Sequence, residues 1–193
     1  ALAAATILVV GAPAAPASAR PSERGSRQSP GPFGWLLPVP APAGWSRAVI
    51  PSGEATVAFP PSFTPIISDP GSVSAAVRSS TGAYRAYLNV TPRQGRERLR
   101  GFASFRVHRL GEEHDESVHQ ETATEGLAFD AGRASCVLDH YATRVGHHHY
   151  REIACVVTGR RGGAVVVVAA ATTAEWDHFR PLLRRAVASL TVS

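Results

Sequence analysis

Residues 136–155 read CVLDHYATRVGHHHYREIAC, and this stretch decides the fold because its two halves mirror each other. Folding it about its centre places Cys136 opposite Cys155 and, in the same register, Leu138 opposite Ile153. Directly opposed residues on antiparallel strands lie about 4.5–5.5 Å apart at Cα, a separation that a disulfide accepts. The sequence therefore predicts an antiparallel hairpin that is closed by a Cys136–Cys155 disulfide.

These two cysteines are the only ones in the chain. Two reduced thiols or a pair of metal ligands are the alternatives, but two cysteines leave no further ligands of their kind for a metal. A bridge that closes a loop of about 20 residues stabilises a fold by about 3 kcal/mol in the chain-entropy model. The register also sets Asp139 opposite Glu152. Because like charges across a ladder are unfavourable, we expect both carboxylates to be solvated.

A second hairpin is predicted from apolar alternation. Residues 73–77 and 84–90 each alternate apolar and polar side chains, and a Ser-Ser-Thr-Gly turn cluster separates them. Closing that four-residue loop pairs Val77 with Tyr84 and places both apolar sets on one face.

Residues 164–171 form an unbroken apolar run rich in valine. A strand that is apolar on both faces must be covered on both. One cover is a C-terminal helix, which a Thr172-x-x-Glu175 capping box introduces. The other is a helix over residues 97–110, in whose apolar face Arg106 is the exception. Strands joined by hairpins rather than crossovers then predict a single α+β domain, an antiparallel sheet covered by helices on both faces in an α/β/α sandwich.

Local signatures support this order. They are Val57-Ala-Phe-Pro-Pro-Ser-Phe63, Tyr87-Leu-Asn-Val90, Gly132-Arg-Ala134 at the start of a strand, and a Trp176 helix that runs into Ala188-Ser-Leu-Thr-Val192. The pattern resembles the PsbP-like fold family, including its secreted actinobacterial members, over about residues 45–192. The resemblance implies a PsbP-like fold and a binding or accessory role, since members of the family are mostly not enzymes with a shared catalytic centre. It carries over no functional residue.

The N-terminal part differs in composition, because 13 of the 15 prolines lie in the first 70 residues. Residues 1–12 are apolar and the small triplet Ala17-Ser-Ala19 follows, which is typical of a secretory signal peptide over residues 1–19, cleaved after Ala19. A buried helix or an anchor is the alternative. Arg20 stands where a lipoprotein would need cysteine, and no stretch reaches the roughly 18 apolar residues of a spanning helix. We therefore expect a secreted protein with no lipid anchor and no transmembrane segment.

Residues 20–44 are rich in Pro, Ser and Gly and predict a flexible linker before a globular domain over residues 45–193. Within this linker, the apolar island Phe33-Gly-Trp-Leu-Leu37 is interpreted as a docking segment that lies on the domain.

Charge is patterned along the chain. With 44% hydrophobic and 18% charged residues, the composition excludes wholesale disorder. Residues 93–109 hold six arginines and one glutamate, and residues 110–130 hold seven acids and no arginine. The candidate surface for an anionic partner consists of Arg93, Arg96, Arg98, Arg100 and Arg109. A solvated helix face, neutralised by the acids that follow, is the alternative. Nucleic acid is not expected, because the basic run lacks interleaved aromatic residues.

Catalytic motifs are absent from the sequence, which has no Gly-x-Ser-x-Gly, HExxH, phosphate-binding glycine loop or CxxC. The alternation of the cysteine hairpin places His140, His147 and His149 near one another as a candidate zinc or copper site, although hairpin tips are ordinarily just polar. We predict a monomeric, non-enzymatic binding or accessory protein of the bacterial envelope or exterior without a cofactor. Its partner is an unidentified envelope component or protein, bound in a groove beside the sheet. The alternative is a metal-binding protein or hydrolase that uses the three histidines.

Overall fold

The structure is a computed structural model that describes residues 31–193 except 114 and 131. The predicted signal peptide and the linker up to residue 30 lie outside the described residues. The elements are β1 (Ser46–Val49), β2 (Ala55–Phe59), β3 (Thr64–Ile66), β4 (Val73–Arg78), β5 (Tyr84–Pro92), α1 (Phe102–Glu112), β6 (Glu116–Phe129), β7 (Gly132–Ala142), β8 (His149–Thr158), β9 (Ala164–Thr172), a 3-10 turn (Thr173–Glu175), α2 (Trp176–Ala188) and β10 (Thr191–Val192).

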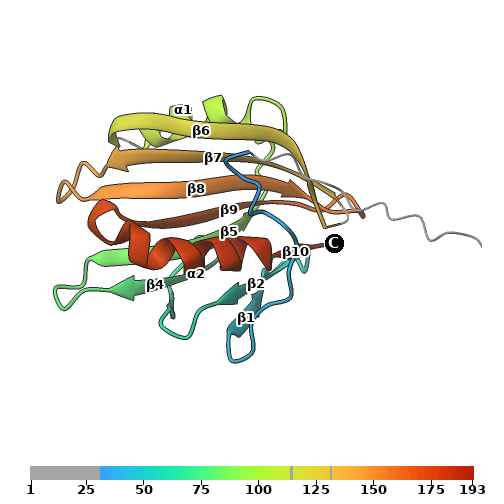
Figure 1. Cartoon of the computed structure of the whole chain (residues 1–193), viewed down its shortest axis with the longest axis horizontal. Coiled ribbons are helices and arrows are strands. Elements are labelled where there is room, and N and C mark those ends of the chain that lie inside the picture. The colour runs from blue at the N-terminus through green and yellow to red at the C-terminus, as the bar shows by residue number, and fades with distance from the viewer. Residues whose placement is uncertain (1–30, 114, 131) are drawn as a thin grey trace, which may run out of the picture.

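The described residues form one α+β domain with two antiparallel sheets (Figure 1). The large sheet has seven strands in the order β3-β4-β5-β9-β8-β7-β6, and the small sheet has the order β1-β2-β10. The single antiparallel α+β domain is thereby confirmed, whereas the small sheet was not predicted. Among the described residues, neither α-helix is long and apolar enough to cross a bilayer.

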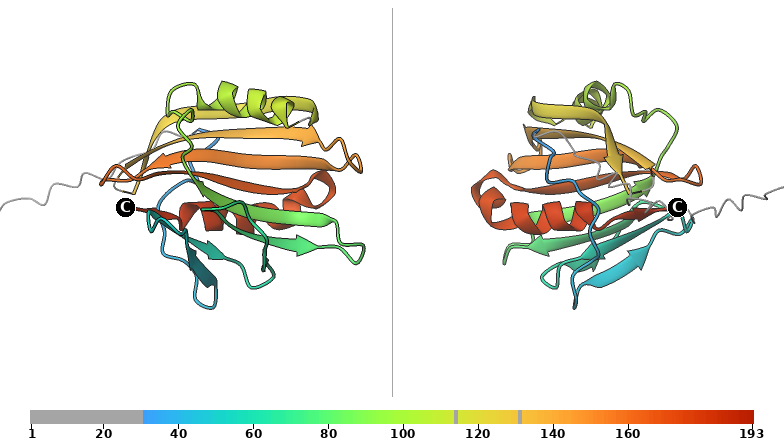
Figure 2. Two further views of the ribbon diagram at one scale, coloured as in Figure 1. Left: turned by 180° about the vertical axis from the view of Figure 1, so that it is seen from behind. Right: turned by 45° about the vertical axis from the view of Figure 1, so that its right-hand side comes forward.

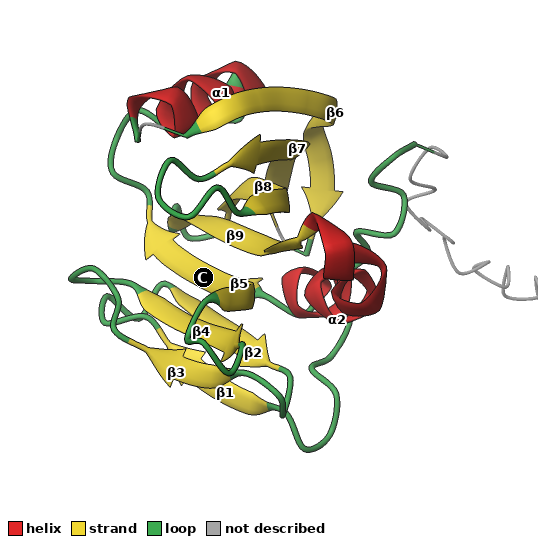
Figure 3. Ribbon diagram, turned by 90° about the vertical axis from the view of Figure 1, so that its left-hand side faces the viewer, coloured by secondary structure: helices red, strands yellow, loops and turns green. Residues whose placement is uncertain are grey.

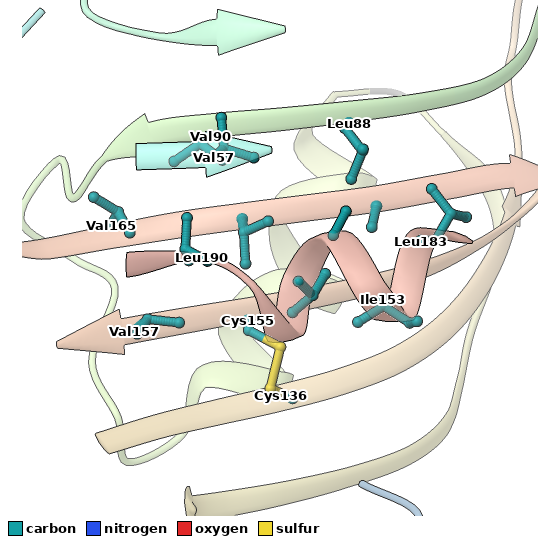
Figure 4. Packing of buried hydrophobic residues seen from close by; sticks show 14 of the residues in the cluster. Val57, Leu88, Val90, Cys136, Ile153, Cys155, Val157, Val165, Leu183 and Leu190 are labelled. Carbon is teal, nitrogen blue, oxygen red and sulfur yellow. A yellow bond between two sulfur atoms is a disulfide. The ribbon is translucent and has the colours of Figure 1, made fainter. Parts of the chain in front are cut away.

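The β7–β8 hairpin has the predicted register, with Cys136 opposite Cys155 and Leu138 opposite Ile153. The two cysteines form a disulfide, their Cα atoms lie 4.1 Å apart, and both side chains are buried. Figure 4 shows the bond among core side chains that include Leu183 of α2. The predicted disulfide is confirmed.

The β4–β5 register differs from the prediction by two residues. Val77 lies opposite Ala86 rather than Tyr84, and the ladder shifts between Val77 and Arg78. The turn closes further along the chain, because the Ser79 amide donates to the Ala83 carbonyl. A slip of two keeps every side chain on its own face, so matching the apolar faces could not distinguish the two registers.

Strand β9 is buried on both faces, as its sequence indicates. Val165 and Val167 share a cluster with Trp176 of α2 and with residues of the small sheet. Val166 shares a different cluster with Phe102 of α1. Figure 3 shows the large sheet from one end, with α1 beside β6 and α2 beside β9. One face of β9 therefore packs against both a helix and a second sheet, which the predicted sandwich omitted.

Both helices begin later than predicted. Helix α1 starts at Phe102 rather than residue 97, because Gly101 adopts a left-handed conformation (φ 77°) that ends the preceding loop. Helix α2 starts at Trp176 after the 3-10 turn, and Thr172 makes no side-chain capping bond. The capping box is therefore not formed. The Glu175 carboxylate instead accepts hydrogen bonds from the Arg85 guanidinium of β5.

The segment before β1 is part of the domain. Phe33 and Leu36 are 2% and 0% exposed and belong to the main core cluster. The Val39 amide donates to the Ala188 carbonyl at the end of α2. The docking of the Phe33–Leu37 island thus follows from its apolar side chains, although the composition around it is that of a linker.

Candidate functional site

A polar groove of about 310 Å³ lies between α1, the loop before it, and strands β5 and β9. We call it the α1 groove; the view from behind shows α1 and this loop above β5 (Figure 2, left). Its lining consists of Tyr87, Asn89, Thr91, Val166 and Val168 from the strands, Asp69 and Ser72 from the turn before β4, and Gln94, Glu97, Phe102, Phe105, Arg106, Arg109 and Glu113 from α1 and its flanks. A second hollow of about 340 Å³ shares Asp69, Tyr87 and Asn89 with it and extends the groove toward Ile67.

Tyr87 and Arg106, which form the floor of the α1 groove, belong to a hydrogen-bonded ion-pair network. Arg106 contacts the Glu152 carboxylate with both Nε and Nη2, at 2.6 Å and 2.9 Å. The Tyr87 hydroxyl donates to Glu152 at 3.3 Å and lies 2.9 Å from the Tyr141 hydroxyl. Burial alone would lower the pKa of Arg106, but the Glu152 charge raises it above its usual value. Burial, reinforced by Glu152, raises the pKa of Tyr87 well above its usual value. Both groups therefore keep their protons at neutral pH and are held in place.

Asp139 lies in the same layer, directly opposite Glu152. Both residues are 0% exposed, so the prediction that they are solvated is wrong. The physical reason is that Arg106 of α1 supplies a cation to Glu152 inside the fold. This ion pair also explains why an arginine lies in the apolar face of α1. Neither oxygen of Asp139 has a hydrogen-bond partner among the residues that the structure describes. Burial and the Glu152 charge raise the pKa of Asp139 to about 9, so this carboxyl is neutral at pH 7.

The predicted anionic-partner surface divides into two parts. Arg109 lies on α1 and makes ion pairs with Glu112 at 3.4 Å and Glu113 at 3.0 Å, as the neutralised-face alternative expects. The other four side chains, those of Arg93, Arg96, Arg98 and Arg100, are exposed on the loop before α1 and form no ion pair with any described residue. We call these four the arginine rim, because their loop also supplies Gln94 and Glu97 to the groove.

Two groups connect the arginine rim to the groove. Glu97 is 8% exposed, and its carboxylate accepts a hydrogen bond from the backbone N–H of Gln94 at 3.1 Å. This bond holds the Glu97 side chain against its own loop. On the opposite wall, Asn89 Oδ1 is buried and has no hydrogen-bond partner in the described part of the chain. A buried acceptor without a donor is destabilising, so a donor group in the groove would be stabilised there.

The structure does not gather the three predicted metal-ligating histidines into one cluster. The described residues contain no group of three or more His, Cys, Asp or Glu side chains that could hold a metal ion. Strand β6, whose register the sequence did not predict, places Glu121 3.4 Å from His140 and Glu116 3.9 Å from His147. His149 lies opposite Ala142 on β7.

No protein-family model matches the chain, and no curated protein matches its sequence. Solved structures do match its fold. The cyanobacterial PsbP (CyanoP) of Synechocystis superposes with a TM-score of 0.55 at 16% identity, over 79% of this chain and 94% of that one. The protein of unknown function PA94 from Pseudomonas aeruginosa superposes with a TM-score of 0.51 at 10% identity, over 77% of this chain and 97% of that one. The fold is PsbP-like. At these identities the likeness concerns the fold alone.

Sequence reasoning on this PsbP-like domain missed Tyr87, Asn89 and Glu152 as groove or network residues. Tyr87 and Asn89 were interpreted as parts of an alternating strand and of a local signature of the fold, with no role in binding. The available signal was the coincidence of two anomalies, an arginine in an apolar helix face and two opposed acids in a hairpin. Together they could have indicated that α1 packs over the middle of β7 and β8. In the structure, Arg106 of α1 pairs with Glu152 of β8.

Proposed function

We propose that this PsbP-like domain is a non-enzymatic protein of the bacterial envelope or exterior that binds a polar, negatively charged envelope component in the α1 groove. The observation that carries the proposal is the arginine rim, four exposed cations without ion-pair partners among the described residues, beside a groove with a fixed polar floor. Unpaired cations at the edge of a cleft attract anionic ligands and raise their association rate.

The groove suggests what the ligand presents. Asn89 Oδ1 is an acceptor without a donor, which favours a ligand hydroxyl or amide N–H at that point. Phe105 is partly buried and offers an apolar surface beside it. The acidic groups lie inside the groove and the unpaired arginines outside it. A chain with hydroxyl groups within and carboxylates or phosphates toward the rim, such as an anionic glycan, fits this division.

A binding role rather than catalysis is supported by the protonation of the floor. Tyr87 and Arg106 both hold their protons firmly, so neither is a base at neutral pH. A groove whose polar groups are already fixed costs little ordering entropy when a ligand binds.

The proposal places the protein outside the cytoplasm, with the predicted signal peptide over residues 1–19. The Cys136–Cys155 disulfide supports an oxidising compartment, since such bonds are rare in the bacterial cytosol. We also infer a monomer in which α1 and α2 cover opposite faces of the large sheet. The separate packing of Val166 with α1 and of Val165 with α2 supports that arrangement.

The test compares two hexasaccharides by calorimetry, hexagalacturonate, which carries carboxylates, and the neutral maltohexaose. We expect only hexagalacturonate to bind, with an affinity that falls between 50 and 200 mM salt as for other cation-dominated interfaces. Arg96→Gln combined with Arg98→Gln should weaken binding about tenfold. The matched control, Arg160→Gln with Arg161→Gln on the exposed β8–β9 turn, should change it less than twofold. Equal losses in the two double variants would refute binding at the arginine rim.

A further inference from the structure

A separate cavity of about 360 Å³ lies on another part of the molecule, between α2 and the segment that precedes β1. We call it the α2 groove; Figure 2 (right) shows this blue segment passing the end of α2. Its lining consists of Trp35, Leu37, Val39, Arg180, Pro181, Arg184, Arg185 and Ala188. No residue is shared with the α1 groove, so the two sites are independent.

The apolar wall of the α2 groove is held in place from below. Phe33 and Leu36 are buried in the core on either side of Trp35. Further along, the Arg185 guanidinium donates to the Pro40 carbonyl at 3.2 Å. Leu37 is 48% exposed, although it belongs to an otherwise buried apolar segment. The groove therefore offers a fixed apolar surface that is open to solvent.

The charged wall is unbalanced. Among the described residues, three arginines and no acid line the groove, and only Arg180 of these arginines has an acidic partner, Asp177 at 3.4 Å. The guanidinium of Arg184 lies 5.1 Å from the ring centre of Trp35. It makes no hydrogen bond or ion pair with any described residue, and its Nε is buried. Burial, together with the charges of Arg180 and Arg151, lowers the pKa of Arg184.

An anion beside Arg184 would remove two unfavourable features of the α2 groove. It would supply an acceptor for the buried Nε–H, and it would offset the repulsion among the guanidiniums. A small inorganic anion would leave the apolar wall of Trp35 and Leu37 in water. A neutral lipid could offer an acceptor oxygen but no negative charge to offset the repulsion among the guanidiniums. A carboxylate attached to an aliphatic chain satisfies both walls at once.

We propose that the α2 groove binds a free fatty-acid anion, with its carboxylate at Arg184 and its chain along Trp35, Leu37 and Pro181. Guanidinium and carboxylate form two parallel hydrogen bonds, which fixes the head group. The chain contributes by burial, and each buried methylene raises affinity by about threefold to fourfold. This inference does not depend on the ligand of the α1 groove.

The experiment measures the binding of acetate, octanoate, decanoate and decanol by calorimetry, below the concentrations at which they form micelles. We expect no binding of acetate, and an affinity for decanoate about tenfold higher than for octanoate, since two methylenes are added. Decanol should bind at least tenfold more weakly than decanoate. Arg184→Gln should lower decanoate affinity at least tenfold, because a charged hydrogen bond is lost, and Arg184→Lys should lower it less.

Two further variants complete the experiment, one as a control and one as a test of the apolar wall. Arg160→Gln removes an exposed charge elsewhere and should leave decanoate affinity unchanged. Leu37→Ser alters a half-exposed side chain, so the protein should still fold while the dependence on chain length weakens. Equal affinity for decanol and decanoate, or equal effects of Arg184→Gln and Arg160→Gln, would overturn the proposal. So would binding to phosphatidylglycerol vesicles without binding of monomeric decanoate, which would indicate a membrane-docking surface instead. Hexagalacturonate binding in Arg184→Gln would show that the α1 groove is unaffected.

Discussion

Replacing Asp139 by asparagine should make the free energy of unfolding less dependent on pH between pH 4 and pH 9. In the parent, the contribution of Asp139 to stability falls as the pH rises through this range. The Asp139 carboxyl is 0% exposed, and burial together with Glu152 raises its pKa from 3.8 to about 9. The folded state therefore holds this proton more tightly than the unfolded state does. The stability that the protonated acid provides is complete below about pH 4, and it is lost as the pH rises toward 9.

The expected size follows from the pKa difference. Each unit between the unfolded and folded pKa changes the free energy of unfolding by about 1.4 kcal/mol. At pH 7, slightly more than three units above 3.8, the loss is at most about 5 kcal/mol. Asparagine has the same shape and no charge, so its contribution does not change with pH. Its buried amide adds a constant offset of about 1–3 kcal/mol, so the slope and not the offset is diagnostic.

The assay is urea denaturation followed by tryptophan fluorescence, at intervals of half a pH unit. The free energy of unfolding of Asp139→Asn minus that of the parent should become steadily more positive as the pH rises to about 9. Asp115, whose pKa burial and Glu113 raise to about 6, titrates in both proteins and cancels in the difference. Asp69→Asn, which makes the same substitution at an exposed acid, is the control. A flat difference for Asp139→Asn would refute the reasoning, because the carboxyl would then be ionised throughout.

Three further changes test the rest of the structure by the same denaturation assay. Arg106→Met should lower the free energy of unfolding by about 3–5 kcal/mol, because it leaves the buried Glu152 charge without its cation. Adding Glu152→Gln should recover most of that loss, and no recovery would mean that the pair is not coupled. Replacing Cys136 and Cys155 together by alanine should cost about 3 kcal/mol, and thiol labelling of the parent should find no free cysteine. Leu36→Ala should cost about 2–5 kcal/mol, whereas a cost below about 0.5 kcal/mol would show that the segment before β1 is not part of the core.

The sequence predicts the parts of this fold that short-range patterns determine. The β7–β8 register follows from the symmetric positions of Cys136 and Cys155, since a disulfide allows no slip along the strands. The β4–β5 hairpin has no such marker. Its apolar pattern repeats every two residues, so the true pairing of Val77 with Ala86 and the predicted pairing with Tyr84 bury the same face.

The parts that were missed depend on contacts between distant segments. Asp139 and Glu152 were expected in water because like charges oppose each other across the ladder. Arg106, which pairs with Glu152, reaches it only when α1 packs on the sheet. The small sheet likewise joins β2 to β10 from opposite ends of the chain. The sequence did not predict that α1 starts only at Phe102, which places Arg98 and Arg100 on a loop rather than on the helix.

The position of β9 also affects how the domain is assembled. It lies between β5 and β8, so it joins the β3–β5 hairpins to the β6–β8 hairpins, although it comes last of the seven strands in sequence. A nascent chain that ends before residue 164 has two separate groups of strands with facing unpaired edges. Such edges pair readily with other chains, and closure between distant segments is slow. The newly made protein therefore depends on the synthesis of β9, which begins at residue 164, to cover these edges.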